Sequence, residues 1–426
     1  MKAALLGSVL LFSQATGAQA GLIDDVTALL DSHERIKAAK ADVKSAIANL
    51  EVARGGYYPT ASVTANVGNE NITTVGESTD TQTSMAQREV DISLTQTLYD
   101  FGATAASASS SSLSLDQAKV TLNQTRQSIL LAAVSAQLNL ISAKRVLDFQ
   151  KESEASIKRQ TELEDARVQR GSGFSTDVLQ AKRQLAGAKA QRVTAEGALR
   201  QALNRYRAVF GTVPEDINSL EIPKISTVNL PATEEDLVAK ALENNPQVKI
   251  QTIVADIADA SVASSKAAYY PTIEASAEQK YKRDVGGTEG DKNERLIKIE
   301  ATYDFNFGWT AQNTLLASKS GLSAANARLK DTRDQIEEQA RNAWRALITA
   351  RETAEFRQNE ANIAGEFLDL ARKERTLGQR SLIDVLSGET AHINALAGAV
   401  QAKTQTSVAA LNVLNIMGEL DMSVLQ

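Results

Sequence analysis

The chain has 426 residues, a formal net charge of −6 and no cysteine. Its length leaves room for two or three ordinary domains, yet only 4% of its residues are aromatic. That composition is typical of long helices with small interface residues, and not of a compact enzyme. The acidic balance argues against nucleic acid as a partner. With only His33 and His392 available, no zinc cluster is expected, and we expect neither a cofactor nor enzyme activity.

The first twenty residues have the pattern of an export signal. Lys2 precedes an apolar run from Ala3 to Phe12, and Ala18-Gln19-Ala20 forms a small-x-small cleavage site. We predict a signal peptide over residues 1–20, with a buried N-terminal helix as the alternative. No cysteine follows the run, so no lipid anchor is expected. No other apolar run approaches the ~18–20 residues of a membrane-spanning helix. Any membrane span is therefore expected to consist of strands.

A long repeat is visible in the sequence. Tyr-Tyr-Pro-Thr occurs at 57–60 and again at 269–272, which is 212 residues later (269 − 57). Two pairs of glycines further along the chain have a common spacing. Gly378 follows Gly171 by 207 residues (378 − 171), and Gly418 follows Gly211 by the same number. Landmarks that keep their order and nearly their spacing indicate two copies of one unit.

Proline placement divides the two copies. Residues 60–213 and 272–426 contain no proline, which permits very long helices because proline breaks helix interiors. Pro214, Pro223, Pro231 and Pro246 fall in one segment. We predict a first repeat over 21–211, an irregular equatorial linker over 212–246 and a second repeat over 247–426.

Each repeat is predicted to contain one strand hairpin, at about 60–99 and about 272–307. In the first, apolar residues alternate with polar ones through Val63, Val67, Val90, Ile92 and Leu94. In the second, the residues expected on one face are Ile297, Ile299, Ala301, Tyr303, Phe305 and Phe307. Alternation of period two over about 9–11 residues is typical of a tilted strand that crosses a bilayer. Four strands cannot close a barrel, and lipid does not tolerate open sheet edges. We therefore expect three copies to share twelve strands.

Aromatic residues gather where helix is expected to meet strand. This is the depth at which an interfacial aromatic belt lies, and core packing is the alternative. The predicted belt residues are Tyr57, Tyr58, Tyr99, Phe101, Tyr269, Tyr270, Tyr303, Phe305 and Trp309.

Two very long helices are predicted, from Gly102 to Gly171 and from Gly308 to Gly378. At ~1.5 Å per residue each would extend roughly 100 Å. The serine-rich stretch near residues 108–112 has a flexible linker as its alternative. Each helix is followed by a glycine-containing turn, at about 171–177 and about 378–384, and by a returning helix. Ser381 followed by Asp384 has the pattern of a capping box at the start of the second returning helix.

With these features in place, the sequence resembles the TolC family of outer-membrane channel proteins. The resemblance covers essentially the whole mature chain and rests on Asn-Asn-Pro-Gln-Val at 244–248, the two Tyr-Tyr-Pro segments, the Tyr-Asp-Phe motifs and the paired Asp-Val-Leu turns. It implies an α+β membrane protein in which a homotrimer shares a twelve-stranded barrel in outer-membrane lipid. A long helical tunnel then extends into the periplasm of a Gram-negative cell. The sequence of this chain departs from the family pattern at Ser32-His33-Glu34, where the second repeat has Asn244-Asn245-Pro246.

The resemblance also assigns roles to the two turns. It implies a periplasmic gate of Thr176, Asp177, Arg375, Arg380 and Asp384, with Arg375 or Arg380 bonded to Asp177 and Asp384 ringing the entrance. Asp177 and Asp384 have a simpler alternative as carboxylates favoured by the helix dipole in a first turn. The residues implied to contact a periplasmic adaptor protein are Gly171, Gly173, Phe174, Val178, Leu179, Gly378, Ser381, Leu382, Val385 and Leu386.

The function implied is the exit duct of a tripartite export machine, working with an adaptor and an inner-membrane transporter of the ABC type. Type I secretion of a protein is favoured, because many drug-efflux members of the family carry a lipid anchor and none is expected in this chain. Small-molecule efflux is the first alternative. A periplasmic coiled-coil structural protein is an alternative of another class, but it does not explain the paired hairpins. A passive porin needs more strands per chain.

Overall fold

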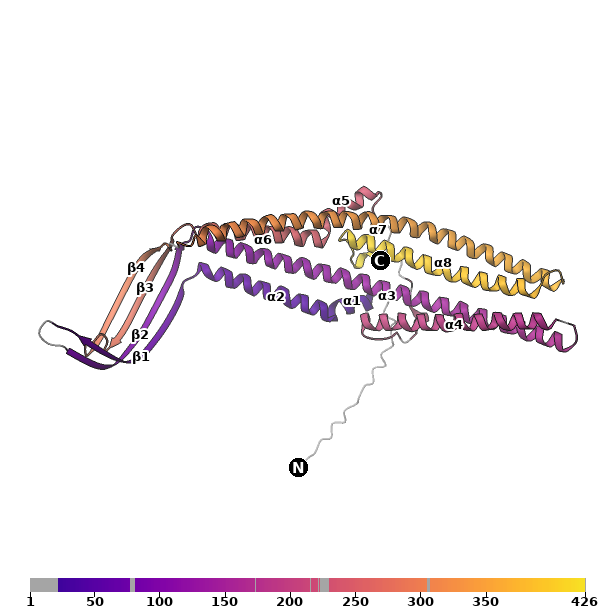
Figure 1. Ribbon diagram of the computed structural model, residues 1–426, viewed down its shortest axis with the longest axis horizontal. Coiled ribbons are helices and arrows are strands. Elements are labelled where there is room, and N and C mark those ends of the chain that lie inside the picture. Colours follow the sequence, from indigo (N-terminus) through magenta and orange to yellow (C-terminus); the bar gives the residue numbers. More distant parts are fainter. Residues whose placement is uncertain are drawn as a thin grey trace, which may run out of the picture.

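A computed structural model describes residues 22–76, 81–172, 174–214, 216–220, 222, 230–304 and 307–425. The predicted signal peptide, Gly173 and Phe305 lie outside these residues. The molecule is long and narrow: helices form a slender body, and a sheet projects from one end of it (Figure 1). The opposite end is formed by the two helical turns.

The two repeats have the same order of elements. The first contains α1 (Leu22–Ser32), α2 (Glu34–Arg54), β1 (Thr60–Thr74), β2 (Thr81–Tyr99), α3 (Ala103–Gln169) and α4 (Ser175–Phe210). The second contains α5 (Glu234–Asn244), α6 (Pro246–Ala267), β3 (Thr272–Arg283), β4 (Asp291–Thr302), α7 (Thr310–Thr376) and α8 (Leu382–Ile416). Helix α5 lies inside the segment 212–246 that was predicted to be irregular, and it takes the place that α1 has in the first repeat. Short 3₁₀ turns lie at Gly55–Tyr57, Ile217–Ser219 and Met422–Leu425.

The predicted long helices are confirmed. α3 and α7 each have 67 residues, and every residue of α7 lies 207 positions after its counterpart in α3 (310 − 103). The serine-rich stretch is part of α3, so the linker alternative is wrong. Small side chains allow helices to approach closely, and in this stretch α3 runs between α2 and α6 (Figure 1).

The departure at Ser32-His33-Glu34 does not change the fold. His33 caps α2, and its Nδ1 accepts a hydrogen bond from the Arg35 amide at 3.1 Å. Asn245 caps α6 in the same way, with Oδ1 accepting from the Gln247 amide at 2.8 Å. An imidazole and a carboxamide thus satisfy the same helix N-terminus 212 positions apart (245 − 33).

The four strands form one antiparallel sheet in the order β1-β2-β3-β4. The β2–β3 pair joins the two repeats, with Ile92 opposite Gln279 and Leu94 opposite Ala277. Neither β1 nor β4 has a second neighbour in the described part of the chain, so both edges of the sheet are open.

The second hairpin is shorter than predicted. β4 ends at Thr302, opposite Thr272 at the start of β3. Pro271 precedes that residue and has no amide hydrogen to extend the ladder. Tyr303 and Phe307 therefore lie beyond the strand, and their predicted place on the face of Ile297 is wrong.

The sheet is curved, and one contact shows its concave face. The amide of Gly286, in the loop between β3 and β4, donates to Oε2 of Glu70 on β1 at 2.7 Å. This loop reaches past β2 to the first strand, and Gly287 lies close to the side chain of Ile72. The face that carries Glu70 is therefore the inner one.

Two apolar clusters hold the middle of the helical body, one for each repeat. The first includes Val26, Ile36, Val134, Val209 and Leu414. The second includes Leu237, Val248, Leu347, Val413 and Met417. Because α8 contributes to both clusters, the two repeats share one packed belt.

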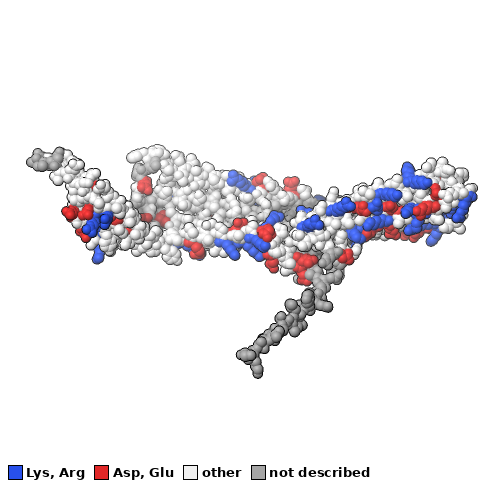
Figure 2. Space-filling model, turned by 90° about the horizontal axis from the view of Figure 1, so that it is seen from below, with Lys and Arg blue, Asp and Glu red and all other residues white. Residues whose placement is uncertain are grey.

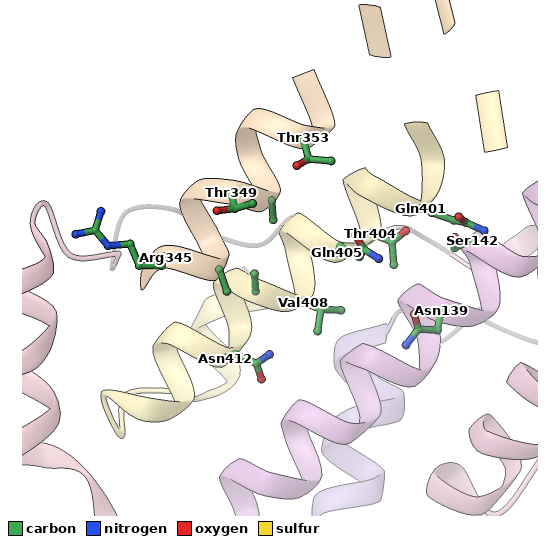
Figure 3. A pocket seen from close by; sticks show the side chains of 13 residues that line it. Asn139, Ser142, Arg345, Thr349, Thr353, Gln401, Thr404, Gln405, Val408 and Asn412 are labelled. Carbon is green, nitrogen blue, oxygen red and sulfur yellow. The ribbon is translucent and has the colours of Figure 1, made fainter. Parts of the chain in front are cut away.

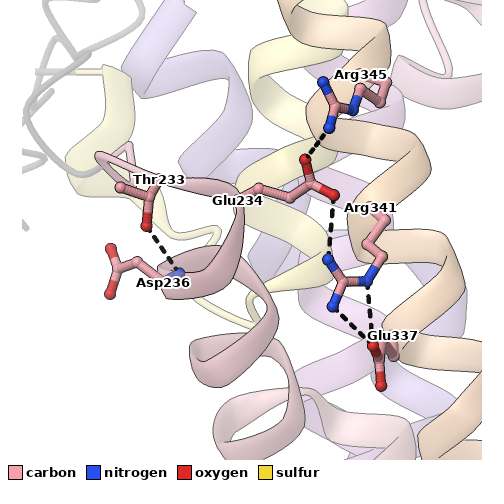
Figure 4. Close-up of polar contacts among 6 residues, drawn as sticks. All are labelled: Thr233, Glu234, Asp236, Glu337, Arg341 and Arg345. Carbon is pink, nitrogen blue, oxygen red and sulfur yellow. Dashed lines mark hydrogen bonds and ion pairs between the residues drawn. The ribbon is translucent and has the colours of Figure 1, made fainter.

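An ion-pair network fastens α5 to α7 at this level (Figure 4). The Glu234 carboxylate accepts a hydrogen bond from Arg341 at 3.2 Å and forms an ion pair with Arg345 at 2.7 Å. Arg341 also binds Glu337 at 2.9 Å, and Thr233 caps α5 by accepting from the Asp236 amide at 3.1 Å.

By length and composition, α3 contains one 18-residue window apolar enough to cross a membrane. No such segment was expected from the sequence. In the structure 56% of that window is buried inside the protein, as in a core helix. Apolar residues of α3, among them Leu130, Val134 and Leu138, pack in the first apolar cluster.

Candidate functional site: the helical tip and the strand junction

The two turns at the tip have the same backbone design. Gly171 and Gly378 both have a φ of 78°, and each donates to a carbonyl three residues earlier. The next amides, of Ser172 and Gln379, donate to carbonyls five residues earlier at 3.0 Å. This pair of bonds is the Schellman ending of a helix, and its left-handed position favours glycine because glycine has no Cβ to strain the backbone.

The returning helices start earlier than the predicted turns end, at Ser175 and Leu382. The predicted cap at Ser381 is confirmed, since its Oγ accepts from the Asp384 amide at 3.2 Å. In the first turn, Phe174 occupies the corresponding position and offers no side-chain cap.

Four of the residues predicted to contact an adaptor are buried. Val178, Leu382, Val385 and Leu386 are at most 6% exposed. Within one chain these four side chains are packed against their neighbours, and their contact with an adaptor stays a prediction. The apolar side chains that are accessible at the tip are Phe174, Leu179 and Leu377, each at least 67% exposed. Leu377 was not among the predicted tip residues, because nothing in the local sequence distinguishes it from other apolar residues near the end of a helix.

Arg375 links the two helical hairpins. Its Nη2 donates to Oε2 of Glu164 on α3 at 3.1 Å, and its Nη1 donates to the Arg380 carbonyl at 3.2 Å. The Glu164 side chain is only 6% exposed, and Arg167 on its own helix lies 3.4 Å from the same carboxylate. The carboxylate that meets Arg375 in the folded chain is therefore Glu164, and not Asp177.

The other predicted gate residues lie near this pair. Arg380 binds Glu374 at 2.6 Å and lies over the ring of Phe367, 5.2 Å from its centre. Thr176 and Asp384 are exposed and Asp177 is half-buried. Among the described residues, the carboxylates of Asp177 and Asp384 have no ion-pair partner. Within one chain both have the surroundings of first-turn carboxylates.

Equivalent positions of the two hairpins carry ion pairs of opposite polarity. On the first hairpin Asp165 of α3 binds Lys182 of α4 at 3.2 Å. The positions 207 residues later hold Arg372 of α7 and Glu389 of α8, which also form an ion pair. Lys182 is exposed whereas Glu389 is 7% exposed, so the second pair lies deeper.

The aromatic residues of the strand junction are accessible. Phe101, which is stacked on Tyr270 at 4.5 Å, is 37% exposed, and the other described members of the predicted belt are more exposed. Within one chain these residues do not lie in the core, and the interfacial belt stays a prediction. A cavity of about 780 Å³ opens among them, lined by Tyr269, Tyr270, Tyr303, Phe307 and Trp309 together with Asp100 and the start of α7.

The two faces of the sheet differ in chemistry. On the face of Glu70, Lys282 binds both Glu89 at 3.4 Å and Glu294 at 3.1 Å. The opposite face carries Val63, Val67, Ile297 and Ile299, which are at least 70% exposed. Figure 2 shows this charged cluster on the sheet and a second concentration of charge towards the tip. A concave charged face and a convex apolar face fit a strand wall between water and lipid.

Between α3, α7 and α8 lies a cavity of about 620 Å³ (Figure 3). Its polar lining is mostly amides and hydroxyls, including Asn139, Thr349, Gln405 and Asn412, and Arg345 is the one charged residue among the described residues that line it.

Comparison with known proteins identifies the family. The profile of the family "Outer membrane efflux protein" matches residues 26–212 and 237–419, one match for each repeat. The chain belongs to this family. It is therefore an outer-membrane channel protein that extends into the periplasm, and not an enzyme.

Several individual proteins of this family resemble the chain over most of its length. "Outer membrane efflux protein BepC" of Brucella suis is 24% identical over 98% of this chain and 91% of its own length. "Proteases secretion protein PrtF" of Dickeya chrysanthemi is 21% identical over 99% and 93%. "Outer membrane protein TolC" of Escherichia coli is 21% identical over 71% and 64%.

The fold has solved counterparts. The Campylobacter jejuni CmeC outer membrane channel superposes with a TM-score of 0.81 at 16% identity, covering 94% of this chain and 87% of CmeC. Four strands per chain and long helices in two repeats are thus the architecture of the TolC-like trimeric channels. Channels of this family act as efflux or secretion ducts with an adaptor and an inner-membrane pump.

Proposed function

We propose that three copies of this chain form one exit duct, with a closed twelve-stranded barrel in the outer membrane and a helical tunnel in the periplasm. The observation that carries this is the open sheet. It has two unpaired edges, an apolar convex face and a charged concave face, and it continues into helices of 67 residues. Open edges are excluded from lipid, and cyclic closure with identical copies satisfies both of them.

A direct test is native mass spectrometry of the detergent-extracted protein, followed by conductance measurements in a planar bilayer. We expect a trimer that conducts ions. A monomer, or a trimer that never conducts, would contradict the proposal.

For the cargo we propose protein, delivered by a type I machine with an adaptor and an ABC transporter. The full-length likeness to a protein named for protease secretion supports this class. The likeness to a protein named for efflux over 98% of the chain supports small-molecule efflux as the second candidate. No described cavity separates the two, because a duct touches its cargo only in passing.

The two cargo classes are separated by comparing wild type with a gene deletion. Secreted proteins are compared by mass spectrometry, and sensitivity to antibiotics and detergents is scored in parallel. Loss of a secreted protein with unchanged sensitivity supports protein secretion. Unchanged secretion with raised sensitivity supports efflux and contradicts our choice.

We further propose that the tip is a gate. Three copies of the exposed Asp384 would ring the entrance and favour cations. The bond from Arg375 to Glu164 would hold hairpin α7–α8 against α3, and Arg380, bound to Glu374, would brace the turn of its own hairpin. Replacing Asp384 by Asn should reduce cation preference, measured as a shift in reversal potential under a salt gradient. Asp369→Asn, an exposed change higher on α7, is the control. An unchanged reversal potential in the Asp384 variant would place the selective ring elsewhere.

A further inference from the structure

The sheet contains one junction between repeats, and this junction predicts how two copies of the chain meet. β2 ends the first hairpin and β3 starts the second, and they pair in a defined register. In a ring of identical chains the same relationship recurs between β4 of one copy and β1 of the next. The inference rests on the proposed trimer and adds the register to it.

Equivalent positions in the two repeats follow from the structure. β1 and β3 both begin directly after a Tyr-Tyr-Pro segment, at Thr60 and Thr272, so their positions differ by 212 (272 − 60). Thr60 lies opposite Thr95, and Thr272 lies opposite Thr302. Equivalent positions of β2 and β4 therefore differ by 207 (302 − 95). The long helices give the same offset independently.

These two offsets convert each pair in the β2–β3 junction into a pair between chains. Ile92 lies opposite Gln279. The equivalent position of Ile92 on β4 is Ile299 (92 + 207), and that of Gln279 on β1 is Val67 (279 − 212). By the same steps, Ser93–Glu278 gives Glu300–Asn66 and Leu94–Ala277 gives Ala301–Ala65.

We propose that β4 pairs antiparallel with β1 of the neighbouring copy in the register that places Ile299 opposite the neighbour's Val67. This register keeps the faces consistent. Ile299 and Val67, 73% and 80% exposed in the single chain, meet on the apolar convex face. Glu300 and Asn66 meet on the charged concave face. A slip of one residue would put Ile299 beside a residue of the opposite face, which a strand wall in lipid strongly disfavours.

The helices below the sheet support the same arrangement. Inside the chain α3 packs against α6 of the second repeat, so the equivalent partner of α7 is α2 of the neighbour. Both helices carry unpaired apolar side chains at this level. Val52 on α2 is 76% exposed and Leu316 on α7 is 62% exposed. Cover by the neighbouring copy accounts for both.

The two kinds of seam differ at the strand junction. Within the chain Tyr270 stacks on Phe101. Its equivalent on the open edge is Tyr58, but the position equivalent to Phe101 (101 + 207) is Gly308, between Phe307 and Trp309. The seam between chains therefore keeps the strand register without this aromatic stack.

Disulfide trapping tests the register. The chain contains no cysteine, so only the introduced cysteines can form disulfides. The test variant carries Ile299→Cys and Val67→Cys. Directly opposed residues have Cα atoms about 4.5–5.5 Å apart, within the range that a disulfide bridges. The matched control carries Ile299→Cys and Val63→Cys. It uses the same face but lies four residues away, roughly 13 Å along the strand and beyond disulfide reach.

On mild oxidation in isolated outer membranes, the test variant should become a covalent trimer on a denaturing gel, and the control should remain a monomer. Native mass spectrometry of both reduced proteins tests the trimer separately. A native trimer that fails to cross-link at 299–67, or cross-links in the control, overturns the register and leaves the duct intact. Absence of a trimer in both overturns the proposed function itself.

Discussion

Arg375 on α7 donates a hydrogen bond to Glu164 on α3, with Nη2 and Oε2 3.1 Å apart. The two residues are 211 positions apart (375 − 164) and belong to different repeats. This ion pair therefore joins hairpin α7–α8 to hairpin α3–α4 close to the tip. Glu164 is almost completely buried, so the pair is shielded from the solvent that weakens surface ion pairs.

Replacing Glu164 by Gln should loosen the tip. Removing one partner of a buried pair costs about 3–5 kcal/mol, and the cost is smaller here because Arg375 is partly exposed. We expect more frequent and longer high-conductance openings in a planar bilayer.

The control is Asp165→Asn, one residue further along α3. Its partner Lys182 lies within the same hairpin, so this change removes a charge without touching the link between hairpins. If both variants opened the channel equally, general charge loss and not the Glu164–Arg375 pair would control the tip.

Gly418 should tolerate no side chain. A Cβ at this position would lie 2.5 Å from the Asn244 carbonyl oxygen, and the backbone has a φ of 73°. Gly418→Ala should therefore combine left-handed strain of about 1–2 kcal/mol with a backbone clash, separating α5–α6 from the end of α8. We expect a lower melting temperature and less folded protein in the membrane.

Gly211 offers a matched control for this clash. It occupies the equivalent position of the first repeat with a φ of 78°, but a Cβ there would meet nothing within 4 Å. Gly211→Ala thus tests the strain alone. Equal losses in both variants would show that the close approach to Asn244 is unimportant.

Much of this architecture was predictable from the sequence, because local sequence patterns determine it. Strand alternation, proline placement and the glycine spacing gave the repeats, the strand pairs and both 67-residue helices. The partner of Arg375 was not predictable in this way. Choosing Glu164 over Asp177 depends on how two hairpins from different repeats pack, and no spacing within either hairpin encodes that choice.

The predicted end of β4 was wrong for a related reason. Tyr303 and Phe307 continue the alternating pattern, so the sequence extends the strand through them. The ladder nevertheless stops at Thr302, because its partner strand starts after Pro271. Likewise, Val178 and Leu386 lie near the starts of α4 and α8, and their burial was not predictable from the local sequence. Leu386 is buried against residues of α3 and α4, a contact between the two hairpins.

Glu234 should be needed to hold α5 against α7. Its side chain is 13% exposed and lies between two arginines of α7. Glu234→Gln keeps the size but removes the charge, and amide hydrogen exchange in α5 should become a few-fold faster because partly exposed pairs contribute about 0.2–1 kcal/mol each. Asp236→Asn is the control, since Asp236 forms its ion pair with Lys240 on the same helix, at 3.8 Å. Equal acceleration in both would assign the effect to helix capping.

Asp25 should make stability depend on pH. Burial on α1 and the nearby charge of Asp24 raise the pKa of Asp25 above its usual 3.8. A carboxyl with a raised pKa favours the folded state when protonated. Its contribution is fully present below the unfolded pKa and is lost as pH rises through the folded value. At neutral pH the charged form therefore destabilises the fold, and Asp25→Asn should raise the melting temperature.

The raised pKa of Asp25 also determines how the effect of the substitution changes with pH. The gain from Asp25→Asn should shrink as pH falls through the raised pKa and vanish below about 3.8, where wild-type Asp25 is also neutral in both states. Melting curves measured across this range provide the check, with Asp31→Asn on the exposed side of the same helix as control. A gain that stayed constant with pH would mean that the variant acts through packing beside Tyr206, whose own pKa is raised by burial and then by the Asp25 charge.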